Sequence, residues 1–453
     1  MKDGGFDVII GNPPYVRQET LGEEFKAYAK QNFETYAGTA DLYIYFIEQA
    51  HKLLKYGGYF GMIVSNKWMR SNYGKALREF LKRESQLVEI VDFGELPVFG
   101  EVLAYPVIII SQREKTQKQY FNYSPIKSLD FDSLVEEVKS SVVNLDERAI
   151  EGDIWSLTTS NSKDILDKLW QKSVPLGEFV KNHIYYGIKT GYNEAFVIPR
   201  DMRDRLVDSD PKSAEIIKPF LMGRDVHEYR IDYYNRYLIF TRRGIDIKNY
   251  TAVHKFLKQF KERLTPKPRD WKGENWNGRK PGPYQWYEIQ DSVDYYAEFE
   301  KPKIILPSIV QKATFAYDSE GLYSNDKTTI IPTDNLYLLA VLNSKISDYF
   351  LRQIASTKQG GYFEQKPMYI SQLPIRRIDF ENPAEKSAHD EIVKLVEKML
   401  ALQKERQSVR REDDLDRVRN LERQIAQVDE EINQKVYALY GLTEDEIKIV
   451  EGG

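Results

Sequence analysis

The amino-acid sequence predicts an α/β domain with part of a doubly wound sheet, then a mixed α+β domain, and then a C-terminal pair of long helices. Up to about Ser111, short β-branched apolar runs alternate with amphipathic segments, as in a doubly wound sheet. The middle of the chain carries short strand-like runs around a Gly-bounded turn. Beyond Pro374, apolar residues recur at spacings of three and four, which is typical of packed helices.

Composition indicates a globular protein of two or three domains and excludes several classes of site. The 453 residues are 42% hydrophobic and 30% charged, which is ample material for packed cores. The absence of Cys rules out disulfides and thiolate metal sites, and five scattered His residues argue against zinc. No long apolar run or signal-peptide pattern occurs, so we expect a cytoplasmic protein with no membrane contact and no metal.

The elements of the first domain follow one another in a regular order. A buried strand is expected at Phe6–Ile10, where the β-branched run stops at Gly11. An amphipathic helix is expected from Asp41 to near Lys55, where Gly57 and Gly58 break the pattern. The remaining elements are strands at Tyr59–Val64, Leu87–Asp92 and Val107–Ser111, with a helix ending at Leu81 after the first of them.

The turn after the first strand, Asn12-Pro13-Pro14-Tyr15, carries the chemistry. Ligands of open α/β sheets bind at the carboxyl ends of strands. The side-chain oxygen of Asn12 and the carbonyl of Pro13 could accept both hydrogens of an exocyclic amine and localise its lone pair. Tyr15 offers a flat face on which a base taken out of the helix can stack. The alternative is a plain Pro-rich turn between strand and loop.

Three segments carry a resemblance to a known family: Asn12–Glu19, Ala40–Phe46 and Gly57–Met69. They resemble the gamma-class N6-adenine DNA methyltransferases of type IIG restriction-modification systems. The resemblance implies that Asn12, Pro13 and Tyr15 bind and stack a flipped adenine. It also implies a second aromatic residue on the other side of the base, for which Phe99 is the candidate. A core or hairpin role of Phe99 is the alternative.

The same resemblance implies S-adenosylmethionine as the cofactor, bound mainly by a Gly-rich loop and an acidic residue on strands that precede the NPPY turn. Only five residues precede the first expected strand here, and no such loop is found. We therefore expect most of the cofactor site in a missing N-terminal half. The chain would be a fragment, an expressed piece or a subunit of a split enzyme, with an N-terminal methyltransferase or nuclease portion as a possible partner. No convincing nuclease motif is found.

The expected domains are residues 1–125, the C-terminal half of a methyltransferase; 126–172, a linker or peripheral elements; 173–376, a specificity domain; and 377–453, the long helices. The third region resembles the TaqI-like specificity domain of the same enzymes, which implies double-stranded DNA as the partner and base reading in the major groove. Candidate DNA-binding residues are Lys189 and Thr190 in the Gly-bounded turn, Arg224, and Gly360 and Gly361. An ordinary surface role is the alternative for Lys189, Thr190 and Arg224.

Local charge favours nucleic acid although the whole chain carries a net charge of −4. Between Leu221 and Lys280 there are 15 Lys and Arg against 7 Asp and Glu, interleaved with aromatic residues and Asn. The segment Trp271–Trp286 is rich in Gly, Pro, Trp and basic residues, and either lies against DNA or forms a surface loop packed by its own aromatics.

The C-terminal region predicts two long helices joined by a turn within Glu405–Asp416. Their apolar stripes are Ile392, Leu395, Val396, Met399 and Leu402 on the first helix, and Leu421, Ile425, Val428 and Ile432 on the second. An antiparallel spacer and a dimerisation coil are the two possible uses.

The leading functional hypothesis is a site-specific DNA adenine-N6 methyltransferase that flips its target base and is inactive as this chain alone. A non-catalytic DNA-specificity module or split-enzyme subunit is the first alternative. A protein-glutamine or RNA methyltransferase is the second, because an NPPY turn also suits other planar amide or amine acceptors.

Overall fold

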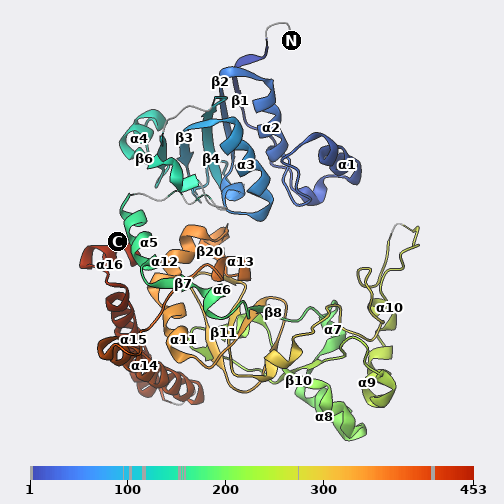
Figure 1. Ribbon diagram of the computed structural model, residues 1–453. Helices are drawn as coiled ribbons and strands as arrows, with labels where there is room; N and C mark the ends of the chain where they lie inside the picture. The colour runs from blue at the N-terminus through green and yellow to red at the C-terminus, as the bar shows by residue number, and fades with distance from the viewer. Residues whose placement is uncertain are drawn as a thin grey trace. The chain divides into compact units, whose positions relative to one another are not determined.

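The computed structural model describes residues 4–94, 96–100, 105–114, 119–150, 155, 157, 160–273, 275–409 and 414–452. The chain divides into two compact units (Figure 1). Unit 1 comprises the chain up to Asp167 together with Arg352–Phe363, and unit 2 comprises Lys168–Leu351 and Glu364–Gly453.

Unit 1 is built on one mixed sheet of six strands in the order β1-β2-β4-β3-β5-β6. The strands are β1 (Phe6–Gly11), β2 (Leu54–Ser65), β3 (Gln86–Asp92), β4 (Pro106–Gln112), β5 (Tyr120–Pro125) and β6 (Val143–Asp146). β1 pairs in parallel with β2, and β3 in parallel with β5. β4 lies antiparallel between β2 and β3. The carboxyl ends of β1, β2, β3 and β5 therefore share one edge of the sheet.

Both faces of this sheet are covered, as expected for an α/β fold. Ile90 of β3 belongs to the larger core, which includes α2 and α3, whereas the adjacent Val91 belongs to a small core with residues of α4. Alternate side chains of a strand point to opposite faces, so one strand contributes to two cores. The helices are α1 (Glu23–Asn32), α2 (Tyr43–Leu53), α3 (Lys75–Glu84) and α4 (Leu134–Ser141), with 3-10 turns η1 (Gln18–Thr20), η2 (Asn66–Met69), η3 (Asn72–Gly74) and η4 (Glu147–Ile150).

The segment after β4 adds two strands to the sheet of unit 1. β5 and β6 extend the sheet, and Trp155 is only 1% exposed in the core of unit 1. The segment expected as a linker or peripheral elements thus contributes the helix α4 and the marginal strand β6 to unit 1. Its weak apolar pattern reflects strands at the margin of the sheet, where fewer positions are buried.

At the other margin, β1 is an edge strand with an apolar surface. Phe6, Val8 and Ile10 are 51%, 58% and 80% exposed. An exposed apolar strand edge is a surface on which another chain segment can pair.

Unit 2 contains several small sheets rather than one large one. One sheet has the strand order β17-β10-β13-β9 and another β16-β14-β18-β8; two further pairs are β11-β12 and β21-β7. The bounds are β7 (Ser173–Pro175), β8 (Tyr185–Tyr186), β9 (Val197–Pro199), β10 (Ile217–Leu221), β11 (Val226–His227), β12 (Arg230–Ile231), β13 (Arg236–Ile239), β14 (Lys303–Pro307), β15 (Ile309–Val310), β16 (Ala316–Asp318), β17 (Tyr323–Ser324), β18 (Thr328–Pro332) and β21 (Pro374–Arg376). The short strands β19 (Thr357–Lys358) and β20 (Tyr362–Glu364), which belong to unit 1 except for Glu364, pair with each other around the turn η9 (Gln359–Gly361).

The two short strands expected around the Gly-bounded turn exist but do not pair with each other. β8 pairs with β18, whereas β9 pairs with β13. The turn thus connects two different sheets, because each short strand completes a sheet whose other strands come from later in the chain.

The helices of unit 2 lie around these sheets, and α14 and α15 form the expected C-terminal pair. They are α6 (Leu176–Phe179), α7 (Asn193–Phe196), α8 (Arg200–Ser209), α9 (Thr251–Lys258), α10 (Lys261–Leu264), α11 (Leu336–Asn343), α13 (Pro367–Ile370), α14 (Pro383–Ser408), α15 (Leu415–Tyr440) and α16 (Glu444–Val450). The residues of α5 (Ser160–Trp170) and α12 (Lys345–Ile354) are divided between the two units. The remaining 3-10 turns are η5 (Pro211–Glu215), η6 (Gly223–Asp225), η7 (Ile247–Asn249) and η8 (Tyr296–Glu300).

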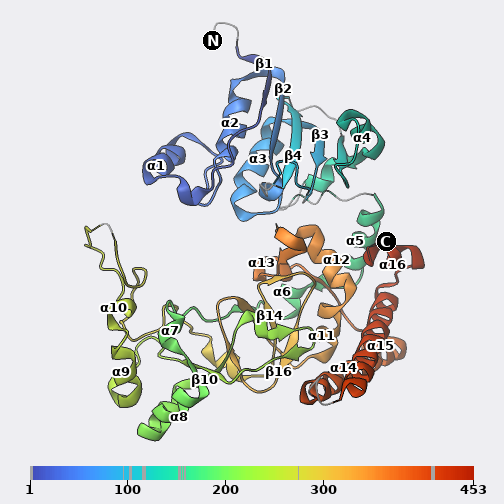
Figure 2. The ribbon, with the colours of Figure 1, turned by 180° about the vertical axis from the view of Figure 1, so that it is seen from behind.

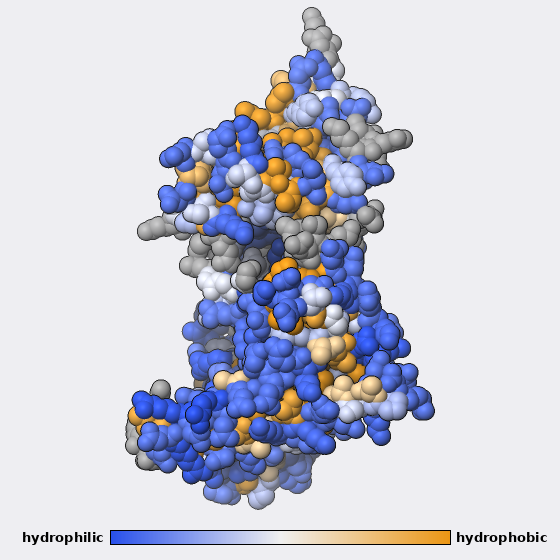
Figure 3. All heavy atoms as spheres, turned by 90° about the vertical axis from the view of Figure 1, so that its left-hand side faces the viewer, coloured by the Kyte–Doolittle hydropathy of each residue, from blue (hydrophilic) through white to orange (hydrophobic). Residues whose placement is uncertain are grey.

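The long pair buries one apolar stripe from each helix. Ile392 and Met399 of α14, and Val428 and Ile432 of α15, are at most 1% exposed. Figure 3, seen from the side of this pair, shows a mainly hydrophilic surface over its outer face. The predicted turn between the helices lies partly outside the described residues. No described helix is both long and apolar enough to cross a membrane.

Candidate functional site

The NPPY turn begins where β1 ends, at the shared carboxyl edge of the sheet in unit 1. Asn12 is exposed and Pro13 is buried, and the carbonyl of Pro14 accepts a hydrogen bond from the Val16 amide at 3.0 Å. Within the described part of the chain, the Asn12 side chain and the Pro13 carbonyl have no hydrogen-bond partner. Two acceptors are therefore held next to each other with their lone pairs available.

Tyr15 is enclosed by two other aromatic rings. Its ring centroid lies 6.3 Å from that of Tyr43 and 5.9 Å from that of Phe99, the latter edge to face. The Tyr15 hydroxyl is buried and has no hydrogen-bond partner among the described atoms. Burial raises the pKa of Tyr15 to about 12, so the phenol stays neutral. Tyr15 thus offers an uncharged ring whose orientation is set by its neighbours.

Phe99 lies in a turn between β3 and β4 that is closed by a hydrogen bond from the Gly100 amide to the Pro97 carbonyl at 3.1 Å. The backbone of Gly100 has φ +66°, a conformation that favours glycine. The neighbouring Leu96 and Val98 pack against the small core, whereas Phe99 belongs to none of the described core clusters. The ring contact with Tyr15 brings together two residues that are 84 positions apart in the sequence.

Sequence reasoning missed the polar groups that follow β2 and β3 at this edge. The side-chain amide of Asn66 donates to the Asp92 carboxylate at 3.2 Å, and the same carboxylate accepts from the Gly94 amide at 2.9 Å. Tyr43 was missed as well; its hydroxyl pairs with that of Tyr73 at 3.0 Å. The sequence contained a signal for Asn66 and Asp92, because each lies at the carboxyl end of a strand that runs parallel to β1, where ligands bind in open α/β sheets.

In unit 2, the turn with Lys189 and Thr190 is held in place by hydrogen bonds to neighbouring segments. Thr190 is 2% exposed, and its hydroxyl donates to the Asn193 side chain at 2.6 Å. Lys189 is partly exposed, and its carbonyl accepts from the Asp291 amide at 3.2 Å. Of the two residues, Lys189 is the one whose side chain reaches the surface, and DNA contact by either residue remains a prediction.

The other DNA-binding candidates lie apart from this turn. Arg224 is exposed in η6, and no ion pair of its side chain occurs among the described residues. Gly360 and Gly361 have φ +74° and +73°, so glycine suits both positions of this turn. In the division of the structure into two compact units they fall within unit 1, and DNA contact by either glycine remains a prediction.

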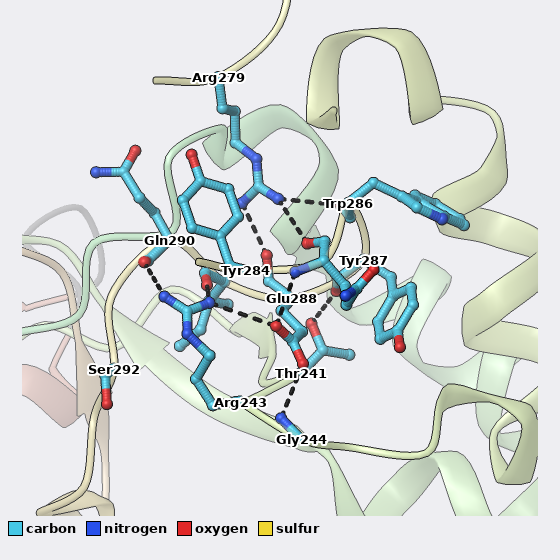
Figure 4. Close-up of polar contacts among 12 residues, drawn as sticks. Thr241, Arg243, Gly244, Arg279, Tyr284, Trp286, Tyr287, Glu288, Gln290 and Ser292 are labelled. Carbon is cyan, nitrogen blue, oxygen red and sulfur yellow. Dashed lines mark hydrogen bonds and ion pairs between the residues drawn. The ribbon is translucent and has the colours of Figure 1, made fainter. Parts of the chain in front are cut away.

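Arg279, which the sequence also did not single out, lies at the centre of a network of polar contacts in unit 2 (Figure 4). Arg279 is 4% exposed and donates to five main-chain carbonyls at 2.7–3.3 Å. These carbonyls belong to Thr190, Leu264, Gln285, Trp286 and Glu288. Burial lowers the pKa of Arg279 to about 10, which leaves it charged at neutral pH.

The carboxylate of Glu288 completes this network. It accepts from the amides of Gly244 and Gln285 at 2.8 and 2.9 Å, and Arg243 lies 3.4 Å away. The Arg279 guanidinium also lies over the ring of Tyr284, 4.4 Å from its centroid. Three separate segments of unit 2 are thus tied together by charged groups that make few contacts with solvent.

No cluster of three or more His, Asp or Glu side chains that could hold a metal ion occurs among the described residues.

Comparison with known proteins assigns both parts of the chain. Residues 1–99 match the Eco57I restriction-modification methylase family, and residues 218–375 match the TaqI-like C-terminal specificity domain. The Type II methyltransferase M.PaeR7I of Pseudomonas aeruginosa is 25% identical over 392 residues, which cover 83% of this chain and 65% of that protein. The Type II restriction enzyme and methyltransferase RM.Eco57I of Escherichia coli is 25% identical over 428 residues, which cover 85% of this chain but only 42% of that enzyme.

A solved structure supports the fold. The Type IIL restriction-modification enzyme MmeI, determined in complex with DNA, superimposes with a TM-score of 0.62 at 13% identity, covering 98% of this chain and 56% of MmeI. The chain therefore spans less than two thirds of the first of these relatives and about half of MmeI. It combines an Eco57I restriction-modification methylase segment with a TaqI-like C-terminal specificity domain, and Type II methyltransferases are its homologues over most of its length.

Proposed function

We propose that the protein to which this chain belongs methylates the N6 amine of adenine at a specific sequence in double-stranded DNA. The observation that carries the proposal is the pair of unoccupied acceptors, Asn12 and Pro13, beside the ring of Tyr15. The matches to a restriction-modification methylase family and to a specificity domain support DNA as the substrate.

The acceptors act on the amine of the target base. The N6 lone pair of adenine is delocalised into the ring, which makes the amine a poor nucleophile. When the Asn12 side-chain oxygen and the Pro13 carbonyl accept the two N–H groups, the nitrogen becomes more tetrahedral and its lone pair is localised. The base must leave the duplex to reach this turn, and the ring of Tyr15 then replaces part of the stacking that it loses. Phe99, edge on to Tyr15, borders the same space.

Methyltransferase homologues imply S-adenosylmethionine, which supplies an electrophilic methyl group when bound. The described residues alone do not fit this cofactor. They present the acceptor turn, but no Gly-rich turn between a strand and a helix occurs in residues 4–94. The apolar surface of β1 lies uncovered beside that turn, with Ile10 at 80% exposure. Additional protein against β1 would enclose the site.

The test is base-modification sequencing of DNA from a methylation-free host that expresses this chain together with the coding sequence directly upstream. N6-methyladenine confined to one short motif is the expected result. Soluble protein without any modified adenine would contradict the proposal.

A non-catalytic role as a DNA-specificity module is the second candidate, because the described residues do not form the cofactor pocket. Two measurements together distinguish the two roles: calorimetric titration of S-adenosylmethionine into this chain, and the base-modification sequencing of methylated DNA. Absence of both binding and methylation, with sequence-specific DNA binding retained, would favour the specificity module.

A further inference from the structure

We propose that residues 265–273 and 275–280, here called the finger, insert into a groove of duplex DNA and contribute to the choice of target sequence. The inference rests on the proposed function and names the element that contacts the substrate. It is carried by the shape of the finger, by the anchoring of its base through Arg279, and by the side chains along it.

The finger extends from the end of α10 away from the rest of unit 2 as a narrow arm (Figures 1 and 2). Its two limbs are joined at the base by hydrogen bonds from the Arg279 amide to the Thr265 carbonyl at 3.0 Å and from the Lys267 amide to the Arg279 carbonyl at 2.9 Å. Further out, Trp271 and Trp276 pack edge to face with centroids 5.0 Å apart. The arm therefore has an aromatic core of its own.

Close approach of the limbs depends on Gly278. A Cβ atom at this position would lie 2.2 Å from the Thr265 carbonyl oxygen and 2.6 Å from Nε1 of Trp276. The same indole nitrogen donates to the Thr265 carbonyl at 3.2 Å. Such packing holds the arm in one shape without support from the main core of unit 2.

The base of the finger is joined to the turn that carries Lys189. The Arg279 guanidinium donates to the Thr190 carbonyl at 3.0 Å, and the Gln290 amide donates to the same carbonyl at 3.1 Å. Gly191, at φ +82°, fits between them, since a Cβ atom there would lie 2.9 Å from Cδ of Arg279. The finger and the Lys189 turn therefore share one rigid base, as Figure 4 shows for the network around Arg279.

The surface of the finger is cationic and rich in hydrogen-bond donors. Arg269, Lys272 and Lys280 are exposed, and none forms an ion pair within the described residues. Asn275 and Asn277 expose side-chain amides, and Trp271 is 42% exposed. By contrast, acidic residues nearer the core of unit 2 are neutralised internally; Asp225, for example, binds Arg236 at 2.7 Å. Residues 265–280 contain five Lys and Arg against two Asp and Glu, so the arm carries part of the excess positive charge of this region.

Duplex DNA is the partner that matches this combination. Phosphates attract the cations, while amide and guanidinium groups can reach base edges in the major groove. A narrow arm with a rigid base can enter a groove that a flat surface cannot. An acidic protein surface would satisfy the cations but would leave the amides and the exposed indole without a function.

The experiment measures binding of the full chain to a fluorescein-labelled random-sequence duplex of about 30 base pairs, by anisotropy, between about 50 and 200 mM salt. The finger variant is Arg269→Ala/Lys272→Ala/Lys280→Ala. Its matched control is Lys394→Ala/Lys398→Ala/Lys404→Ala, which removes the same charge from exposed positions on α14. We expect the finger variant to lose about 10-fold in affinity and the slope of log K against log salt to fall by about 2 to 3, whereas the control stays within about two-fold of the parent.

A second variant, Asn275→Ala/Asn277→Ala, tests base reading by sequencing of methylated DNA from the host described above. A methylation motif relaxed at one or more positions is expected.

Parental slopes in the finger variant together with a parental motif in the amide variant would overturn the inference while leaving the proposed function intact. A parent chain that neither binds the duplex nor supports methylation would overturn both.

Discussion

At the scale of single residues, the candidate site depends on groups whose hydrogen-bonding capacity the fold leaves unused. Asn12 and the Pro13 carbonyl have no partner among the described residues, although they stand at the end of a paired strand. Ligands of open α/β sheets bind at the carboxyl ends of strands, so free acceptors at this strand end are a position where substrate can bind.

Replacement of Asn12 tests the acceptor role directly. We expect Asn12→Ala in the complete enzyme to lower the methylation rate at least about 1,000-fold, because removal of a group that acts on the transition state has effects of this order. DNA affinity should stay within about two-fold of the parent, since phosphate and base contacts elsewhere dominate binding. Gln31→Ala, which removes another exposed amide of unit 1, serves as the control. Normal methylation by Asn12→Ala would refute the assigned role.

Replacement of Tyr15 separates its ring from its hydroxyl. Because the hydroxyl has no hydrogen-bond partner, Tyr15→Phe should keep methylation near the parental rate. Tyr15→Ala should weaken capture of the flipped base by roughly 1 to 3 kcal/mol, the usual contribution of one stacked base. The measurement is fluorescence of 2-aminopurine at the target position, which rises when the base leaves the duplex. Equal fluorescence with Tyr15→Ala and the parent would rule out the stacking role.

At the scale of elements, the sequence predicted most of the strands and helices that position the site. It did not predict which strands pair when they are distant in the sequence. The strands before and after α2 and α3 carry strong apolar runs, so their positions were predicted closely. The antiparallel placement of β4 between β2 and β3 could not be derived, because pairing depends on contacts between distant segments. The hydrogen-bond network around Arg279 was also missed, because its acceptors are main-chain carbonyls, which no side-chain pattern reveals.

The long helical pair meets the rest of unit 2 at a crowded group of carboxylates. Glu228 lies 2.6 Å from Lys312, and Asp348 of α12 and Asp429 of α15 face the same cation. Burial raises the pKa of Glu228 to about 7, with Lys312 opposing this shift and the two aspartates adding to it. The docking of α15 therefore includes a carboxyl group that the fold prefers to keep protonated.

This arrangement predicts how stability changes with pH. A carboxyl group whose pKa is raised on folding contributes stability that is fully present below its unfolded value and is lost as pH rises through about 7. Glu228→Gln should therefore raise the Tm at pH 8 more than at pH 5 in thermal scans. Glu298→Gln, at a surface pair with Lys301 of similar exposure, should not show this difference. A Glu228→Gln shift that is the same at both pH values would contradict the prediction.

At the scale of the whole molecule, the chain consists of two units with separate hydrophobic cores. His51 is fully buried in unit 1, where one ring nitrogen contacts the Ile47 carbonyl at 3.0 Å and the other contacts the Ser111 hydroxyl at 2.9 Å. Burial lowers the pKa of His51 to about 4, and nearby Arg113 adds to this effect. A neutral ring satisfies both contacts, one as donor and one as acceptor.

Protonation of His51 should therefore contribute to the loss of stability of unit 1 in acid. A histidine whose pKa is lowered on folding contributes stability above its unfolded value of about 6.5 that is lost as pH falls through about 4. We expect calorimetry to resolve two unfolding transitions, of which the one assigned to unit 1 shifts down between pH 6.5 and 4. His51→Gln should flatten that shift, whereas His183→Asn, at an exposed position of unit 2, should leave it unchanged. A parental shift in His51→Gln would show that other groups cause it.

The anchoring of the finger has a consequence for how recognition diverges among related enzymes. All five groups that receive hydrogen bonds from Arg279 are peptide oxygens, which every amino acid supplies. Substitutions at Leu264, Gln285 or Trp286 therefore leave these acceptors in place. Residues at the tip of the finger can likewise be replaced without loss of the hydrogen bonds that anchor its base. The proposed DNA preference of the finger could therefore change through substitutions at a few exposed positions, without rebuilding the domain that carries them.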